Sequence, residues 1–176
     1  MTGTMPPRDT VRLSIGKQAM KFSAAHFTLF GPGSRERLHG HDYFVSADLR
    51  TRVGDDGLCF DYGILKRQLM ALCQELDEYV LLPAESPLLR IERDGDRVEA
   101  VFGEERIPFL AADVQVLPLA NVTLEELARW FLGRLMAACG ERFEGWGLEW
   151  LRLSVEAGPG QRAGVEWPVA GRPPGA

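Results

Sequence analysis

Two histidines separated by one residue, His39 and His41, are the first side chains in this chain that could do chemistry. In a β-strand, residues two apart point to the same face of the sheet, so both imidazoles could bind one ion. The third histidine, His26, ends a preceding extended segment, and a hairpin-like return would bring it opposite that pair. Three neutral imidazoles with an open fourth position form the usual catalytic zinc arrangement. The alternative is a pair of surface imidazoles beside a turn, and spacing alone does not decide between the two.

Composition limits the kind of protein that could carry such a site. The chain has 176 residues, 45% of them hydrophobic, which suits one domain with a sizeable core. Its formal charge of −5 disfavours binding to a nucleic-acid backbone. No apolar run approaches the roughly 18–20 residues that a membrane helix needs. The cysteines, Cys59, Cys73 and Cys139, are isolated, which argues against a disulfide framework and for a reducing cytoplasm.

The strands that would position the histidines are predicted from extended patterns in which apolar and polar residues alternate. One such segment leads to His26 and another continues from Tyr43, and the Gly- and Pro-containing charged stretch between them reads as a loop. Strands are predicted at residues 11–26, 43–53, 58–60, 114–117, 149–157 and 163–167.

Two helices are predicted from apolar residues at helical spacing. The first begins at Asp61, a plausible N-cap, and extends to about residue 76. The second begins at Thr123, which forms a capping box with Glu126, and Gly140 provides its C-terminal stop.

A charged hairpin insertion is predicted at residues 85–113, where Asp94 and Gly95 give the signal of a tight turn. Residues 1–10 and 168–176 are expected to be flexible tails, which leaves residues 11–167 as a single domain. Hairpin-linked strands with two long helices predict an α+β fold, in which the two helices pack on one face of an antiparallel sheet.

Several short motifs resemble, in order along the chain, those of the 6-pyruvoyl-tetrahydropterin synthase / 6-carboxytetrahydropterin synthase family. The similarity extends over roughly residues 11–167. The motifs are F-S-A-A-H at residues 22–26, L-H-G-H-D-Y at 38–43, F-D-Y with L-K at 60–66, L-D at 76–77, T-L-E-E-L-A at 123–128 and V-E at 155–156.

The resemblance implies the tunnelling fold (T-fold), in which the sheets of several protomers join into an oligomeric barrel, by resemblance a hexamer with active sites at subunit interfaces. It implies Zn2+ held by His26, His39 and His41, and a small dihydropterin as substrate. Glu156 would be the pterin-anchoring carboxylate, because a carboxylate can accept two N–H bonds from the 2-amino-pyrimidinone edge. Thr123 and Glu125 are candidates for ligand contact or, equally, for helix capping.

The chain departs from the family pattern at the catalytic positions. The cysteine that precedes the H-G-H motif in the synthases is absent, and Glu36 lies three residues before His39 instead. This E-x-x-H-G-H pattern resembles a subgroup of the family associated with folate synthesis, in which glutamate replaces the cysteine. The family's Asp–His pair is replaced by Asp77 and Glu78, which could act as a paired acid and base, although Asp77 could instead cap the first helix.

The subgroup cleaves dihydroneopterin, so the resemblance implies a zinc-dependent lyase that converts 7,8-dihydroneopterin or its phosphates to 6-hydroxymethyl-7,8-dihydropterin by retro-aldol cleavage. Zinc lowers the pKa of a bound hydroxyl, and Glu36 would take its proton. For this role Glu36 would need a somewhat raised pKa, which a desolvated pocket could supply. Two alternatives are 6-carboxy- or 6-pyruvoyl-tetrahydropterin synthase, with a carboxylate replacing the thiol, and a non-catalytic pterin- or purine-binding T-fold protein.

Overall fold

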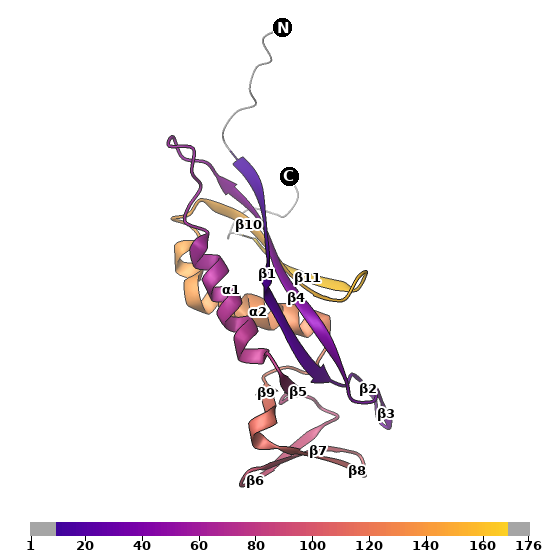
Figure 1. The fold of residues 1–176 in the computed structure, drawn as a ribbon. Coiled ribbons are helices and arrows are strands. Elements are labelled where there is room, and N and C mark those ends of the chain that lie inside the picture. Colours follow the sequence, from indigo (N-terminus) through magenta and orange to yellow (C-terminus); the bar gives the residue numbers. More distant parts are fainter. Residues whose placement is uncertain (1–9, 169–176) are drawn as a thin grey trace.

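The computed structural model describes residues 10–168, which form a six-stranded sheet, two helices and two smaller sheets (Figure 1). The main sheet has the order β11-β10-β4-β1-β5-β9. The elements are β1 (Thr10–His26), β2 (Leu29–Gly31), β3 (Ser34–Arg35), β4 (His39–Arg52), α1 (Gly63–Leu76), β5 (Tyr79–Pro83), β6 (Arg90–Asp94), β7 (Arg97–Phe102), β8 (Glu105–Leu110), β9 (Val114–Leu117), α2 (Leu124–Cys139), β10 (Leu148–Ala157) and β11 (Arg162–Pro168), with 3₁₀ turns at Ala111–Asp113 and Gly140–Arg142.

The long strands β1 and β4 form the antiparallel centre of the sheet, and they pair as far as His26 opposite His39. Alternate residues of β4 are buried from Tyr43 to Thr51, because one face of the strand packs against the helices. On the other face of this strand the residues, such as Phe44, are exposed or half-buried, and we call it the open face. The alternation that predicted these strands is therefore confirmed.

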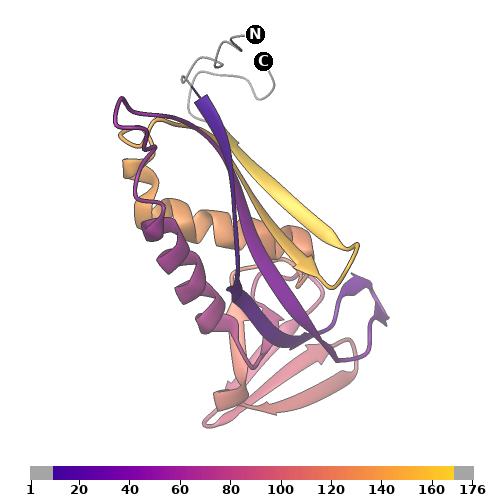
Figure 2. The ribbon, with the colours of Figure 1, turned by 45° about the horizontal axis from the view of Figure 1, so that its top comes forward.

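Both helices cover the same face of the sheet, as Figures 1 and 2 show from two directions. Their apolar stripes meet buried side chains of the central strands in one core that includes Leu69 of α1, Phe131 of α2 and Phe22 of β1. Thr123 Oγ1 caps α2 by accepting a hydrogen bond from Glu126 N at 3.3 Å. The other half of the predicted capping box is missing, since the Glu126 carboxylate accepts from Ala120 N instead.

The beginning of α1 and the segment before it differ from the prediction. The N-cap is Tyr62, and the Asp61 carboxylate accepts from Gly63 N at 2.9 Å, so Asp61 supports the turn that precedes the helix. Residues 58–60 form no strand, because the chain there turns and Leu58 is 68% exposed.

The α+β fold is confirmed, with a sheet that is antiparallel from β11 to β1 and parallel where β5 and β9 join it. The sequence prediction missed β5, which lacks alternation. Leu81 of β5 lies in the core beneath the helices, and Leu82 lies in a second core on the other side. A strand that is buried on both faces reads as a continuous apolar run.

The predicted charged hairpin is a three-stranded antiparallel sheet, β6-β7-β8, which lies beyond the β5 and β9 edge of the main sheet (Figure 2). Its buried residues Val98, Ala100 and Phe102 join Phe27 and Leu29 in the second core. This small sheet is therefore packed against the segment that connects β1 to β4.

The two predicted tails lie almost wholly outside the described residues, since β1 begins at Thr10 and β11 ends at Pro168. Within residues 10–168, no helix is both long and apolar enough to cross a membrane.

Candidate metal centre

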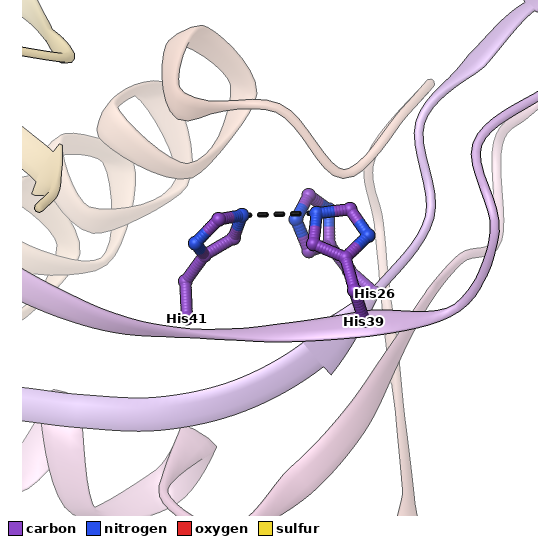
Figure 3. A group of neighbouring side chains, drawn as sticks. All are labelled: His26, His39 and His41. Carbon is purple, nitrogen blue, oxygen red and sulfur yellow. Dashed lines mark hydrogen bonds between the residues drawn. The ribbon is translucent and has the colours of Figure 1, made fainter.

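The three histidines meet at the end of the β1–β4 strand pair, with their side chains directed toward one another (Figure 3). One ring nitrogen from each lies within 4.8 Å of those of the other two. The ring centroid of His39 is 4.7 Å from those of both His26 and His41. His39 and His41 share one face of β4, as their spacing predicted, and antiparallel pairing brings His26 opposite.

Main-chain carbonyls orient two of the three rings. His26 Nδ1 lies 2.9 Å from the oxygen of Val122, which precedes the cap of α2, and His39 Nδ1 lies 2.8 Å from the oxygen of Arg37. Because a carbonyl only accepts, each Nδ1 carries the proton and each Nε2 keeps a lone pair. Nε2 of His39 and Nε2 of His41 are 2.9 Å apart. Histidines that bind metals usually donate their other ring N–H in this way, to a carbonyl, a carboxylate or water.

The environment of His26 fits a bound cation. Its Nε2 is buried and has no hydrogen-bond partner among the residues that the structure describes. Such an atom is costly unless a ligand satisfies it. Burial lowers the pKa of His26, with the neighbouring histidines adding to this effect and the Val122 carbonyl opposing it. The ring is thus held in the neutral form that metal binding needs. The donor set, three neutral imidazoles, suits zinc.

Glu36 lies beside this cluster, immediately after β3. Its carboxylate accepts a hydrogen bond from Thr28 N at 3.0 Å, and its own N–H donates to Thr28 O at 2.9 Å. The expectation of a raised pKa is wrong. Burial does raise the pKa of Glu36, but the hydrogen bonds from Thr28 and the charges of His39 and His26 outweigh it, and the net pKa is lowered. Glu36 is therefore an ionised carboxylate at neutral pH.

Asp77 and Glu78 occupy the turn between α1 and β5. Asp77 Oδ1 accepts from Ser23 N at 2.7 Å, which ties this turn to β1. Glu78 has a left-handed backbone, with φ of 67°, and donates its N–H to Ser23 O. With Ser23 and Asp42, whose side chains are hydrogen-bonded to each other, Glu78 lines a cavity of about 520 Å³. His41 and its strand neighbour Asp42 both line this cavity, so it lies at the edge of β4 beside the histidine cluster.

Glu156 is on the open face. It pairs with Phe44 of β4, which alternates with Tyr43, whereas the histidines share the face of Tyr43. Its carboxylate accepts from Arg162 Nε at 2.9 Å and from Arg162 Nη2 at 2.5 Å. The predicted pterin-anchoring residue is therefore engaged by an arginine and separated from the histidines by the sheet.

The two candidates at the start of α2 lie near the cluster, since Val122, which bonds His26, directly precedes them. The hydroxyl of Thr123 is used as the helix cap, whereas Glu125 is exposed in the first turn of the helix.

Asn121 is a site residue that the sequence prediction missed. Its side chain accepts from Leu29 N at 3.1 Å and donates to Leu29 O at 2.8 Å, so it clamps the start of β2 to the loop before α2. The segment that bears Glu36 and the loop that orients His26 are thereby joined. An Asn two residues before a predicted helix cap was the available signal, but it equally indicates an ordinary turn.

The fold and the site together define a T-fold protein with a candidate tri-histidine metal centre. A family model described as 6-pyruvoyl tetrahydropterin synthase matches residues 15–166. The chain therefore belongs to the 6-pyruvoyl tetrahydropterin synthase family, whose members are lyases that act on pterins and form oligomers.

Relatives from two groups of organisms are similar to this chain. A Methanocaldococcus jannaschii protein, provisionally named 6-carboxy-5,6,7,8-tetrahydropterin synthase, is 28% identical over 148 residues, which are 82% of this chain and 88% of that protein. The structure of 6-pyruvoyl tetrahydropterin synthase from Plasmodium falciparum matches with a TM-score of 0.86 and 28% identity over 92% of this chain and 99% of its own.

The Plasmodium vivax enzyme matches with a TM-score of 0.85 and 28% identity, over 91% of this chain and 99% of its own. Two further structures of that enzyme carry alanine or cysteine in place of a glutamate described as its catalytic residue.

Proposed function

We propose that this chain is a zinc-dependent pterin lyase that cleaves the side chain of 7,8-dihydroneopterin, or its phosphates, to 6-hydroxymethyl-7,8-dihydropterin and glycolaldehyde or its phosphate. The observation that carries the proposal is the position of Glu36, whose carboxylate and N–H are both hydrogen-bonded to Thr28, two residues after the cluster histidine His26. A glutamate also serves as the catalytic residue of the Plasmodium vivax relative, which supports this role.

Each proposed role falls on a residue with suitable chemistry. His26, His39 and His41 would hold zinc, which when bound lowers the pKa of a coordinated hydroxyl. Glu36 takes the proton of the substrate's 2′-hydroxyl, and the C2′–O bond becomes a carbonyl as the C1′–C2′ bond breaks. The electron pair passes into the C6=N5 system of the pterin. A proton delivered to C1′ completes the hydroxymethyl product.

Asp77 and Glu78 are proposed as the acid–base pair for that second proton transfer, with Glu125 or Glu156 binding the pterin ring. Glu156 is on the open face, whereas the histidines are on the face that carries the helices. One copy of the chain therefore does not bring Glu156 and the histidines around one small substrate. We infer that a neighbouring copy supplies Glu156 and, from the turn before β5, Glu78, which agrees with the oligomers that the family forms.

A 6-carboxytetrahydropterin synthase is the second candidate, favoured by the provisional names of the archaeal relatives. That reaction would use the same histidines, with a carboxylate in place of the missing thiol. A metal-holding pterin- or purine-binding protein without catalysis is the remaining reading.

Product analysis separates the candidates. The zinc-loaded protein is incubated with dihydroneopterin and, separately, with its triphosphate, and the products are identified by mass. Glycolaldehyde, or its phosphate, with 6-hydroxymethyl-dihydropterin is the expected result. Acetaldehyde with the 6-carboxy product would instead identify the synthase, and saturable pterin binding without turnover would identify a binding protein.

A further inference from the structure

The short β2–β3 hairpin that leads into Glu36 has little of its own to hold it in place. Its strands, Leu29–Gly31 and Ser34–Arg35, have three and two residues, and Phe30 is 67% exposed. An isolated two-stranded hairpin is marginally stable at best in water. A base that acts at hydrogen-bond range needs firmer positioning, so contacts from outside the hairpin must supply it.

Arg35, the residue before Glu36, makes such a contact with the three-stranded sheet. Its Nε donates to Glu105 Oε2 at 2.7 Å, and its Nη2 donates to the same oxygen. Its Nη1 donates to the main-chain oxygen of Glu36 at 2.8 Å, and the guanidinium lies 5.4 Å from the ring centroid of Phe27. One planar side chain therefore connects the small sheet, the backbone of Glu36 and the second core.

Glu105 is itself held in a defined place. It begins β8, where it pairs with Phe102 of β7, and the Phe102 side chain is buried in the second core. Figures 1 and 2 both show the β2–β3 hairpin beside the end of this sheet. The position of Glu105 is thus set by a packed core, and Arg35 transmits that position to the hairpin.

We propose that the Arg35–Glu105 ion pair is a positioning contact through which the three-stranded sheet holds Glu36 at the metal centre. The catalytic half of this inference rests on the proposed role of Glu36 as base. This contact gives the segment between residues 85 and 113 a function in the reaction, although none of its side chains touches the substrate.

A positioning role and a merely structural role differ in what they predict. An ion pair with one partner as exposed as Glu105, at 58%, contributes little to the stability of the fold. Misplacing a catalytic group by about 1 Å can lower the rate roughly 100-fold. Removal of the contact should therefore lower kcat strongly while the thermal midpoint and zinc content stay nearly unchanged.

The test compares Glu105→Gln, Arg35→Lys and the double variant in the full-length, zinc-loaded protein. Lysine keeps the charge of Arg35 but lacks the planar fork that reaches Glu105 and the Glu36 backbone together. We expect kcat for dihydroneopterin cleavage to fall about 10–100-fold in each single variant, with KM within about twofold. The kcat of the double variant should be no lower than that of the less active single variant, because both substitutions remove one shared contact.

Arg106→Gln is the matched control. Arg106 follows Glu105 on β8 and pairs with Glu92 and Glu99 of the same small sheet at 2.9 and 2.5 Å. The Arg106→Gln substitution therefore removes a similar ion-pair network of the small sheet without affecting the contacts of the β2–β3 hairpin. Its kcat should stay at the wild-type value.

Hydrogen exchange supplies a readout that does not need turnover. The amides of Glu36 and Thr28 are hydrogen-bonded across the base of the hairpin, and both should exchange faster in Glu105→Gln and Arg35→Lys than in Arg106→Gln. Unchanged exchange, or faster exchange with an unchanged kcat, would overturn the inference. If the wild-type protein does not cleave dihydroneopterin, the proposed function fails, and the exchange rates alone decide whether the ion pair holds the hairpin.

Discussion

The histidine cluster and the candidate carboxylates are held by this fold in opposite ways. His26 and His39 are directly paired residues of the two longest strands, and main-chain carbonyls bond both rings. The carboxylates are scattered. Glu36 follows the short β2–β3 hairpin, Glu78 lies in the turn before β5, and Glu156 lies across the sheet from the histidines.

The three histidines of the candidate metal centre come from one chain and lie at the paired ends of its two longest strands. In the proposed reaction, proton transfer would depend on groups that the chain itself supports weakly or that a second copy supplies. Substitutions should therefore separate metal binding from turnover, and the predictions below test that separation from the largest expected effect to the smallest.

The largest effect is expected from His39→Ala, which removes a ring between the other two. Loss of a residue that only supports a metal ligand lowers metal affinity about 10–100-fold, so loss of the ligand itself should lower zinc affinity at least roughly 100-fold. Turnover should be lost with the zinc. The measurement is zinc per chain after dialysis, by mass spectrometry, with Glu104→Gln as an exposed control. Retention of one zinc per chain in His39→Ala would refute the tri-histidine centre.

Glu36→Gln should break turnover while sparing the metal. Loss of a general base lowers the rate about 10²–10⁴-fold, whereas the three imidazoles remain in place. Turnover of dihydroneopterin and zinc content are measured on the same preparation, beside Glu104→Gln, which changes another glutamate in the turn between β7 and β8. Wild-type turnover in Glu36→Gln would show that another group is the base.

Mixing two inactive variants tests the contribution of a second copy. Oligomers formed from equal amounts of His39→Ala and Glu78→Gln chains, unfolded and refolded together, should regain about one quarter of wild-type activity. Random assembly leaves one site in four with both intact contributors when two copies share each site. Activity no greater than that of the separately refolded variants would mean that Glu78 and the histidines act within the same chain.

The smallest effect concerns the metal-free protein. Burial holds the pKa of His26 below its usual 6.5 in the folded state, so below pH 6.5 the unfolded chain binds more protons than the folded one. The free energy of unfolding should therefore fall as the pH drops below 6.5. Above pH 6.5 the titration of His26 should leave it unchanged. Urea titrations between pH 5 and 8 on chelator-treated protein should show this trend, and it should be weaker in His26→Gln. Parallel curves for the two proteins would contradict it.

The sequence was sufficient to predict the regular parts of this structure. Residues two apart on one strand must share a face, so the spacing of His39 and His41 predicted their convergence, and His26 followed from the hairpin-like return. The cap of α2 at Thr123 is also a local property of the chain. These features depend on neighbours in sequence or on one pair of strands.

The missed features depend on contacts between distant segments. β5 shows no alternation because cores cover both of its faces, and the clamp by Asn121 spans 92 residues. The pKa of Glu36 was predicted in the wrong direction because the hydrogen bonds from Thr28 and the nearby histidines are invisible in a linear pattern. The motif order nevertheless placed Glu36 near the histidines, as the resemblance implied.

The most direct test of the central claim is cleavage of dihydroneopterin by the zinc-loaded protein in D₂O, followed by return to H₂O and mass analysis of the pterin product. Retro-aldol cleavage breaks the C1′–C2′ bond and places one solvent deuteron on C1′. We therefore predict 6-hydroxymethyl-7,8-dihydropterin with a single deuterium in its hydroxymethyl group, together with glycolaldehyde. A 6-carboxy product with acetaldehyde, or an unaltered side chain, would contradict the account.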